Sequence, residues 1–169
     1  MIYQKKLASN ILKLGIIQAL RWCMLIMPVV VVFYTENGLS MRAVMVLQAL
    51  YSLTLLLCEV PSGYFSDTLG RRNCLVLGTA LGAAGFAAYS ISYGFYGFLA
   101  AEICLGIGQS FISGTDSALL YDTLLELKEE QHYIKKQGLL LAVGNFSEAA
   151  AGIAGGLIAV VSLRLPFYI

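Results

Sequence analysis

The stretch EVPSGYFSDTLGRRNCLVLG, residues 59–78, interrupts a long apolar sequence with one aspartate and two arginines. Apolar residues resume at once on its far side. Gly70 allows a tight turn, and Arg71 and Arg72 suit the anionic inner surface of a membrane. The stretch therefore predicts a short turn between two apolar helices. Within it, Asp67 either caps the turn or the next helix, or has a more specific role.

Composition places the whole chain in lipid. Of its 169 residues, 59% are hydrophobic and only 12% are charged, which lies outside the range of ordinary soluble domains. The run from Asn73 to Ala101 carries no charge and exceeds the roughly 20 residues that span a bilayer core. A net charge of +1 provides no basic field for nucleic acid. We expect the lipid bilayer as a partner and no nucleic acid.

Metal and enzyme chemistry find no support in the sequence. The four cysteines lie far apart in apolar segments, and His132 has no Cys or His neighbour at ligand spacing. A membrane hydrolase would need a nucleophile and a base at one depth, and the serines near Asp116 have no intramembrane histidine. We expect no metal site, no cofactor and no enzymatic activity.

Apolar segments of near spanning length recur along the chain, which predicts an all-α membrane protein. The expected spans are residues 11–34, 43–65, 73–92, 95–121 and 138–161. Pro166 suits the first turn of a further helix, so a sixth span is expected to begin at about residue 165. The fold class is thus a bundle of five transmembrane helices and the start of a sixth, with residues 122–137 as a charged loop or surface helix.

The distribution of lysine and arginine predicts the orientation. Eight of them fall on the side of the amino terminus, and only Arg42 and Arg164 on the other side. The eight are Lys5, Lys6, Lys13, Arg71, Arg72, Lys128, Lys135 and Lys136. Short cytoplasmic loops carry the excess of positive charge. We expect a multi-pass protein of the inner (plasma) membrane whose amino terminus is cytoplasmic and is retained as a helix.

The turn between the second and third spans resembles the signature loop of the major facilitator superfamily. The spacing of five residues carries the resemblance: Gly63, Asp67, Gly70, Arg71 and Arg72. Thr68 stands where the family usually has a basic residue. The resemblance implies a secondary transporter with about twelve helices in two halves, of which this chain is an incomplete amino-terminal one. It also implies that Asp67 contacts the other half as a conformational latch, and Gly63 is expected to allow close helix approach.

Two other family patterns fit less well. Proton-coupled exporters usually carry an arginine four residues before a glycine of the fourth helix, and here Glu102 precedes Gly106. The exporters' Gly-Pro pair in the fifth helix falls on Ala151 and Gly152. Residues 113–124, in contrast, resemble one bacterial branch of the superfamily. Proton-driven drug export is therefore not indicated by these motifs.

Polar side chains inside the spans are the candidate cavity or coupling residues, because each is costly in hydrocarbon. The set is Arg21, Glu102, Gln109, Asp116, Asn145 and Glu148. Arg21 and Glu148 lie at similar depth, and we expect them to pair, either for packing or for substrate binding or coupling. Asp122 is expected to be solvated. The glycines of the third span (78, 82 and 85) and of the fifth (152 and 156) are expected to form tight helix crossings.

Three functions remain open from the sequence. The first is transport of a small solute by rocking of two six-helix bundles about a midplane site, for which this chain needs its missing carboxyl-terminal half. The second is a truncated membrane protein with no transport activity of its own. The third is a half-transporter in which a second copy supplies the other half. The substrate, the direction of transport and any coupling ion are not encoded in these motifs.

Overall fold

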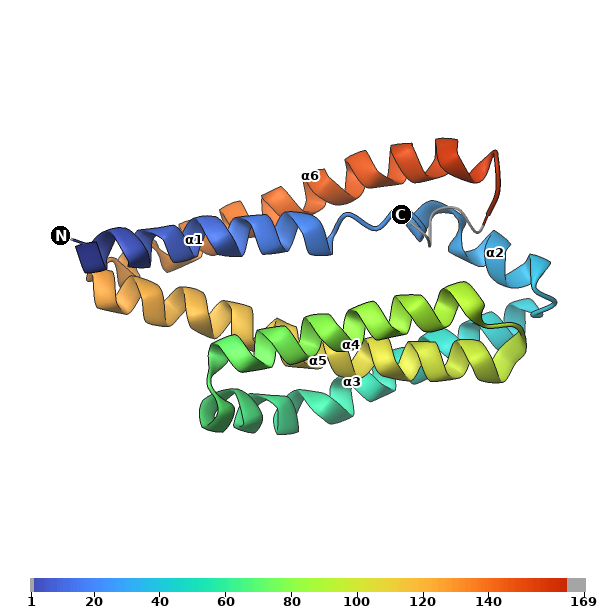
Figure 1. The fold of residues 1–169 in the computed structure, drawn as a ribbon, viewed down its shortest axis with the longest axis horizontal. Coiled ribbons are helices and arrows are strands. Elements are labelled where there is room, and N and C mark those ends of the chain that lie inside the picture. Colours follow the sequence, from blue (N-terminus) through green and yellow to red (C-terminus); the bar gives the residue numbers. More distant parts are fainter. Residues whose placement is uncertain (1, 164–169) are drawn as a thin grey trace.

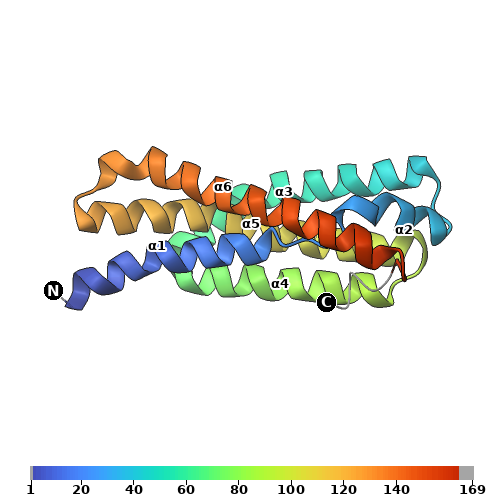
Figure 2. The same ribbon diagram turned by 90° about the horizontal axis from the view of Figure 1, so that it is seen from above.

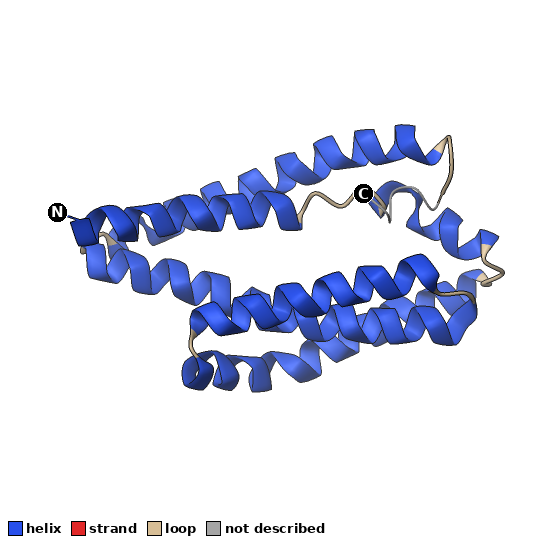
Figure 3. Cartoon of the chain, in the orientation of Figure 1, coloured by secondary structure: helices blue, strands red, loops and turns tan. Residues whose placement is uncertain are grey.

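The computed structural model describes residues 2–163 and is helical almost throughout (Figure 1, Figure 3). The predicted start of a sixth span at about residue 165 lies outside the described residues. In chain order the elements are α1 (Ile2–Arg21), η1 (Met27–Val29), α2 (Val30–Glu36), α3 (Met41–Leu69), α4 (Arg71–Ile91), α5 (Gly94–Leu127), η2 (Glu130–His132) and α6 (Tyr133–Ala159).

Four long helices confirm the all-α membrane fold. α3, α4, α5 and the segment Glu130–Ala159 are each long and apolar enough to cross a membrane. α5 runs on to Leu127, beyond the predicted end at residue 121. The residues it adds include leucines and a glutamate, which are good helix formers, so leaving an apolar environment does not end the helix. Its end comes at Lys128, whose left-handed backbone (φ 60°) forms the C-cap.

The first predicted span, residues 11–34, is wrong as a single helix. α1 ends at Arg21, residues 22–26 are irregular, and the short helices η1 and α2 follow. Pro28 lies in the first turn of η1. Proline has no N–H to donate and its ring clashes with the preceding turn, so it is favoured where a helix begins and disfavoured within one. Residues 22–26 are as apolar as the helices beside them, so hydropathy does not reveal the break.

The helices form two layers joined by one helix (Figure 1, Figure 2). α3 and α4 pack on α5 in one layer, and α1, α2 and α6 form the other. α5 also contacts both α1 and α6, so it connects the layers. The turn at residue 70 and the loop at 128–132 lie toward the end where the chain begins, at the left of Figure 1. Both therefore lie on the side of the amino terminus, as the distribution of lysine and arginine predicts.

Glycines bring α4 and α5 into close contact, as the sequence predicts for two of three positions. A Cβ added at Gly78 would lie 2.8 Å from the backbone oxygen of Gly108, and one at Gly85 would lie 2.6 Å from the Leu105 side chain. Gly82, the third predicted position, faces open space. The two backbones approach because neither glycine interposes a side chain.

The predicted crossing surface of α6 is wrong. A Cβ at Gly152 or Gly156 would have no neighbour within 4 Å. The packed glycine is Gly155, where an added Cβ would overlap the backbone oxygen of Leu25. Because glycines recur on adjacent faces of α6, spacing alone does not select the face that meets α1.

Candidate functional site

The signature loop folds as a single-residue turn. Gly70 is at once the C-cap of α3 and the N-cap of α4, with φ +87°, a conformation that glycine adopts without strain. No side chain caps α4, so the interpretation of Asp67 as a helix cap is wrong. Asp67 instead forms an ion pair with Arg71, one turn later, in which Oδ1 lies 2.8 Å from the guanidinium NH1.

Arg71 ties this turn to α5. Its Nε donates to Asp122 Oδ2 at 3.3 Å, and its NH1 donates to Ser66 Oγ at 3.1 Å. Ser66 is buried and also accepts a hydrogen bond of 3.0 Å from Thr115 on α5. Asp122, expected to be only solvated, is half-exposed but has an ion-pair partner. The sequence missed this partner because it lies 51 residues from Arg71.

The other two signature residues make no such contacts. Gly63 is exposed, and a Cβ there would meet nothing within 4 Å, so the expected close approach at Gly63 does not occur within this bundle. Arg72 is exposed as well. The Asp67 side chain is 67% exposed. The surfaces of Gly63, Asp67 and Arg72 are therefore not covered by the described bundle.

Within the spans, Arg21 pairs with Asp116 and not with Glu148. The guanidinium NH1 lies 3.1 Å from Asp116 Oδ2, and both side chains are largely buried, at 15% and 19% exposed. Asp116 Oδ1 also accepts from the Ser117 amide at 2.7 Å. The expected pairing with Glu148 is wrong. Trp22, the next residue, packs on α6 at Gly144, so the side chain of Arg21 lies on a different face and contacts α5.

Glu102 is the centre of a second buried polar group, at only 4% exposed. Its Oε1 accepts from the Tyr34 hydroxyl at 2.8 Å and from Gln48 Nε2 at 3.0 Å. The hydroxyls of Tyr34 and Tyr89 are hydrogen-bonded to each other. The ring of Phe98 packs edge-on against Tyr34, with centroids 5.2 Å apart. This cluster joins α2, α3, α4 and α5, and the tyrosines in apolar segments are the sequence signal that could have found it.

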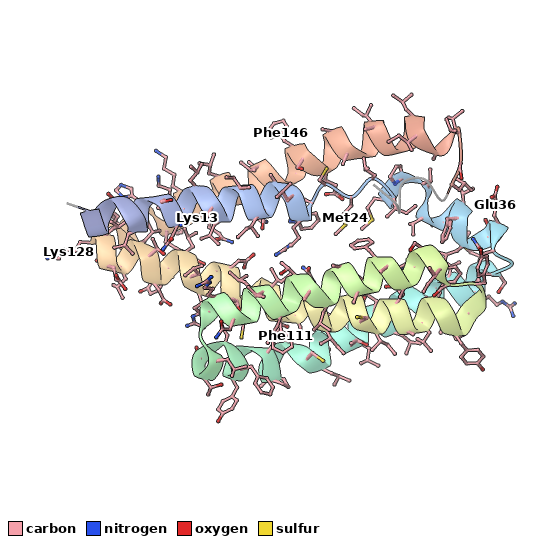
Figure 4. The ribbon with its side chains drawn as sticks, viewed as in Figure 1. Lys13, Met24, Glu36, Phe111, Lys128 and Phe146 are labelled. Carbon is pink, nitrogen blue, oxygen red and sulfur yellow. The ribbon has the colours of Figure 1, made fainter. Side chains whose placement is uncertain are left out.

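The remaining candidates are not brought together. Gln109 and Glu148 are half-buried, and Asn145 is exposed. None of the three makes a side-chain hydrogen bond or ion pair within residues 2–163. Figure 4 shows the neighbouring Phe146 pointing outward from α6, where it is 79% exposed. Asn145 is therefore not packed against the rest of the described bundle.

Charged side chains mark the two ends of the molecule. Figure 4 shows Lys13 and Lys128 toward the end where the chain begins, and Glu36 at the opposite end. Arg71 and its two carboxylates belong to the end of Lys13, because α3 ends and α4 begins there. The Arg21–Asp116 pair belongs to the interior of the bundle. The candidate site thus has a charged surface cluster and separate buried polar groups.

Comparison with known proteins identifies the family. The family profile described as Major Facilitator Superfamily matches residues 15–169. The chain belongs to the major facilitator superfamily. It is 31% identical over 125 residues to the tetracycline resistance protein, class C, of Escherichia coli. This alignment covers 72% of the present chain and 30% of the tetracycline resistance protein. It is 22% identical over 144 residues to the quinolone resistance protein NorA of Staphylococcus aureus (strain N315), covering 85% of this chain and 36% of that protein.

This major facilitator chain therefore spans about a third of the length of the curated relatives it matches. Its family and its four apolar helices make it a multi-pass membrane protein. The family resemblance seen in the loop at residues 63–72 is confirmed by a match that covers nearly the whole chain.

Proposed function

We propose that this chain is the amino-terminal bundle of a major facilitator carrier that moves a small solute across the inner membrane. The observation that carries the proposal is the set of ionisable side chains held inside the spans. Arg21 and Asp116 form an ion pair there, and Glu102 and Glu148 are buried or half-buried. Such groups are costly in hydrocarbon, and in membrane proteins they mark substrate and ion pathways.

Alternating access in this family needs a second bundle for the first to rock against. Either a further segment of the same protein or a second copy of this chain supplies it in the proposal. Asp67 supports this arrangement, because its carboxylate is bound on one side by Arg71 and is otherwise exposed. A group placed in this way contacts a partner in one conformation and water in the other, which is the property of a latch.

Drug accumulation in cells tests the transport function. The relatives carry the names of tetracycline and quinolone resistance, so tetracycline and norfloxacin are suitable first compounds. Cells without their own drug pumps would express the chain alone, two copies in tandem, or the chain joined to a carboxyl-terminal six-helix half. We expect lower accumulation than in vector controls for a completed carrier, and recovery of accumulation with Asp116→Asn. Equal accumulation in every arm would favour the truncated protein with no transport activity.

Cysteine labelling tests the proposed orientation. In a Cys-free background, a cysteine replaces His132 in the α5–α6 loop, and a second variant carries one in place of Asn37 in the α2–α3 loop. The positive charge near residue 132 predicts a cytoplasmic location. A membrane-impermeant maleimide should therefore label the Asn37 variant in intact cells and the His132 variant only after permeabilisation. The reverse pattern would place the amino terminus outside.

A further inference from the structure

The start of α6 carries a cavity lined by charged side chains. It has a volume of about 440 Å³, which is in the range of sites for small molecules. The residues that line it are Glu129, His132, Lys135, Lys136 and Leu139. Neither lysine forms an ion pair in the described part of the chain, although Glu129 lines the same cavity. Two lysines against one carboxylate leave the cavity with an excess of positive charge.

An exposed apolar stripe begins at this cavity. At about 100° per residue, five apolar side chains of α6 and its C-cap fall in line with Lys135, within about 60° of one another. They are Leu139, Phe146, Ile153, Leu157 and Val160, and they are between 58% and 85% exposed. Figure 4 shows Phe146 pointing outward. The face of α6 that packs on residues 22–25, at Gly144 and Gly155, lies on the opposite side, so the described bundle does not cover this α6 stripe.

A second exposed stripe, on α3, ends differently. Its apolar residues are Leu53, Leu56, Leu57, Val60 and Tyr64, which are between 48% and 82% exposed. One turn further on, this stripe reaches the exposed carboxylate of Asp67. A carboxylate at that position repels an anionic group, whereas lysines attract one. Of these two stripes, only the one on α6 joins an apolar surface to a cavity with excess positive charge.

The spacing along α6 matches a phospholipid in one leaflet. At 1.5 Å per residue, Leu139 and Phe146 lie about 6 and about 17 Å from Lys135 along the helix. The hydrocarbon of one leaflet is about 15 Å thick, half of the bilayer core. A phosphate in the cavity therefore places an acyl chain beside these two side chains. Lysines at the anionic inner surface of a membrane attract acidic lipids, so the charge of the cavity favours a lipid over a protein as the occupant.

We propose that the cavity and the start of the α6 stripe bind one anionic phospholipid. Its phosphate lies between Lys135 and Lys136, and an acyl chain lies along Leu139 and Phe146. Glu129 accepts hydrogen bonds from hydroxyl groups of the headgroup, which makes phosphatidylglycerol the best match among anionic lipids. The bound lipid fixes the α5–α6 loop to the leaflet on the side of the amino terminus. This site goes beyond the proposed carrier function and does not depend on it.

Native mass spectrometry of the purified chain in detergent tests the proposal, because it counts bound lipids and gives their affinities. Phosphatidylglycerol and phosphatidylethanolamine with identical acyl chains differ only in the headgroup, and glycerophosphoglycerol is the first headgroup without acyl chains. We expect one phosphatidylglycerol to bind at least about tenfold more tightly than phosphatidylethanolamine. This preference should decrease as the ammonium acetate concentration rises. Glycerophosphoglycerol should neither bind nor compete.

Double variants assign the preference to the cavity. Lys135→Gln with Lys136→Gln should remove it, whereas Lys135→Arg with Lys136→Arg keeps both charges and should retain it. The matched control is Lys13→Gln with Arg72→Gln, which removes two exposed cations from the same side of the molecule but outside the cavity, and it should also retain the preference. Circular dichroism and thermal unfolding show whether each variant folds. If the glutamine pair does not fold, the two single glutamine variants decide, each with an expected loss of about threefold.

Five results would overturn the inference. The first two are equal affinity of the parent chain for both lipids, and a preference that survives in the folded glutamine pair. The third is an equal loss in the control pair, which would indicate the general charge of this end of the molecule. The fourth is displacement of phosphatidylglycerol by glycerophosphoglycerol, which would identify a soluble phosphate ligand. The fifth is a dimer that excludes lipid, which would assign the α6 stripe to a second copy of the chain.

Discussion

The two buried polar regions of this bundle differ in how completely they are satisfied. Around Glu102, the acid and its tyrosine and glutamine partners from α2 and α3 are hydrogen-bonded to one another. At the α1 break, Trp22 Nε1 and the Glu148 carboxylate have no partner among residues 2–163. A satisfied buried network makes the structure more rigid, whereas unpaired buried groups lower its stability. The Glu102 network therefore stabilises the fold, whereas the unpaired groups at the α1 break do not.

The largest expected effect compares the two acids directly. Glu102→Ala leaves the buried Tyr34 hydroxyl without its acceptor and also removes the acceptor of the exposed Gln48 amide, so we expect a loss of about 3 kcal/mol in the free energy of unfolding. Glu148→Ala removes an acid that makes no bond and should leave stability unchanged or slightly raised. Thermal unfolding of both variants in detergent measures the difference. A larger loss from Glu148→Ala would reverse the assignment of the two regions.

The second prediction concerns the contact between Gly155 of α6 and the backbone of Leu25 in the irregular segment 22–26. Alanine at position 155 would place its Cβ in overlap with the Leu25 oxygen, so α6 and residues 22–26 must separate. We expect Gly155→Ala to lower the free energy of unfolding by about 1–3 kcal/mol, as overpacking usually does. Gly156→Ala is the matched control, since it faces open space one residue later. Equal unfolding temperatures for the two variants would show that the contact is not made.

The third prediction decides which acid Arg21 needs. A double-mutant cycle of Arg21→Ala with Asp116→Ala should give a coupling energy of about 1–2 kcal/mol, because the two side chains touch and are mostly buried. The parallel cycle of Arg21→Ala with Glu148→Ala should be additive within about 0.5 kcal/mol. Unfolding in detergent supplies all the values. Coupling found only in the second cycle would restore the pairing that equal depth suggests.

These differences show what the sequence can predict. Hydropathy and charge define four of the spans and the turn at Gly70, because lipid imposes length and polarity on every helix. They missed the break at residues 22–26, since the residues there are as apolar as a helix. They also misassigned the partner of Arg21. Depth along a span follows from residue number, but the direction a side chain takes around the helix depends on which face packs.

The same limit applies to the candidate sites. Gly78 was predicted correctly and Gly156 wrongly from one spacing rule, because neighbours in space select among the faces of a glycine-rich helix. The Glu102 cluster unites residues from four elements, and Tyr34 lies 68 residues from its acid. Tyrosines in apolar segments indicate such a cluster, but which residues meet in it is visible only after the fold is known. The turn of the signature loop was predictable because Gly70 defines it locally, whereas the Arg71–Asp67 contact was not predicted.

The smallest expected effect lies in that surface loop. Asp67 and Asp122 both pair with Arg71, but their side chains are 67% and 50% exposed. Exposed pairs contribute little, so Asp67→Asn and Asp122→Asn should each lower the free energy of unfolding by less than about 1 kcal/mol, and the loss should shrink in high salt.

The two variants should differ in a completed carrier. Asp122 contacts only its own bundle here, whereas Asp67 is available to the second bundle, so only Asp67→Asn should shift the inward-open and outward-open populations. Accessibility of paired inner and outer cysteines measures this shift. An unchanged accessibility pattern with Asp67→Asn would reject the latch and leave Asp67 as a surface ion pair.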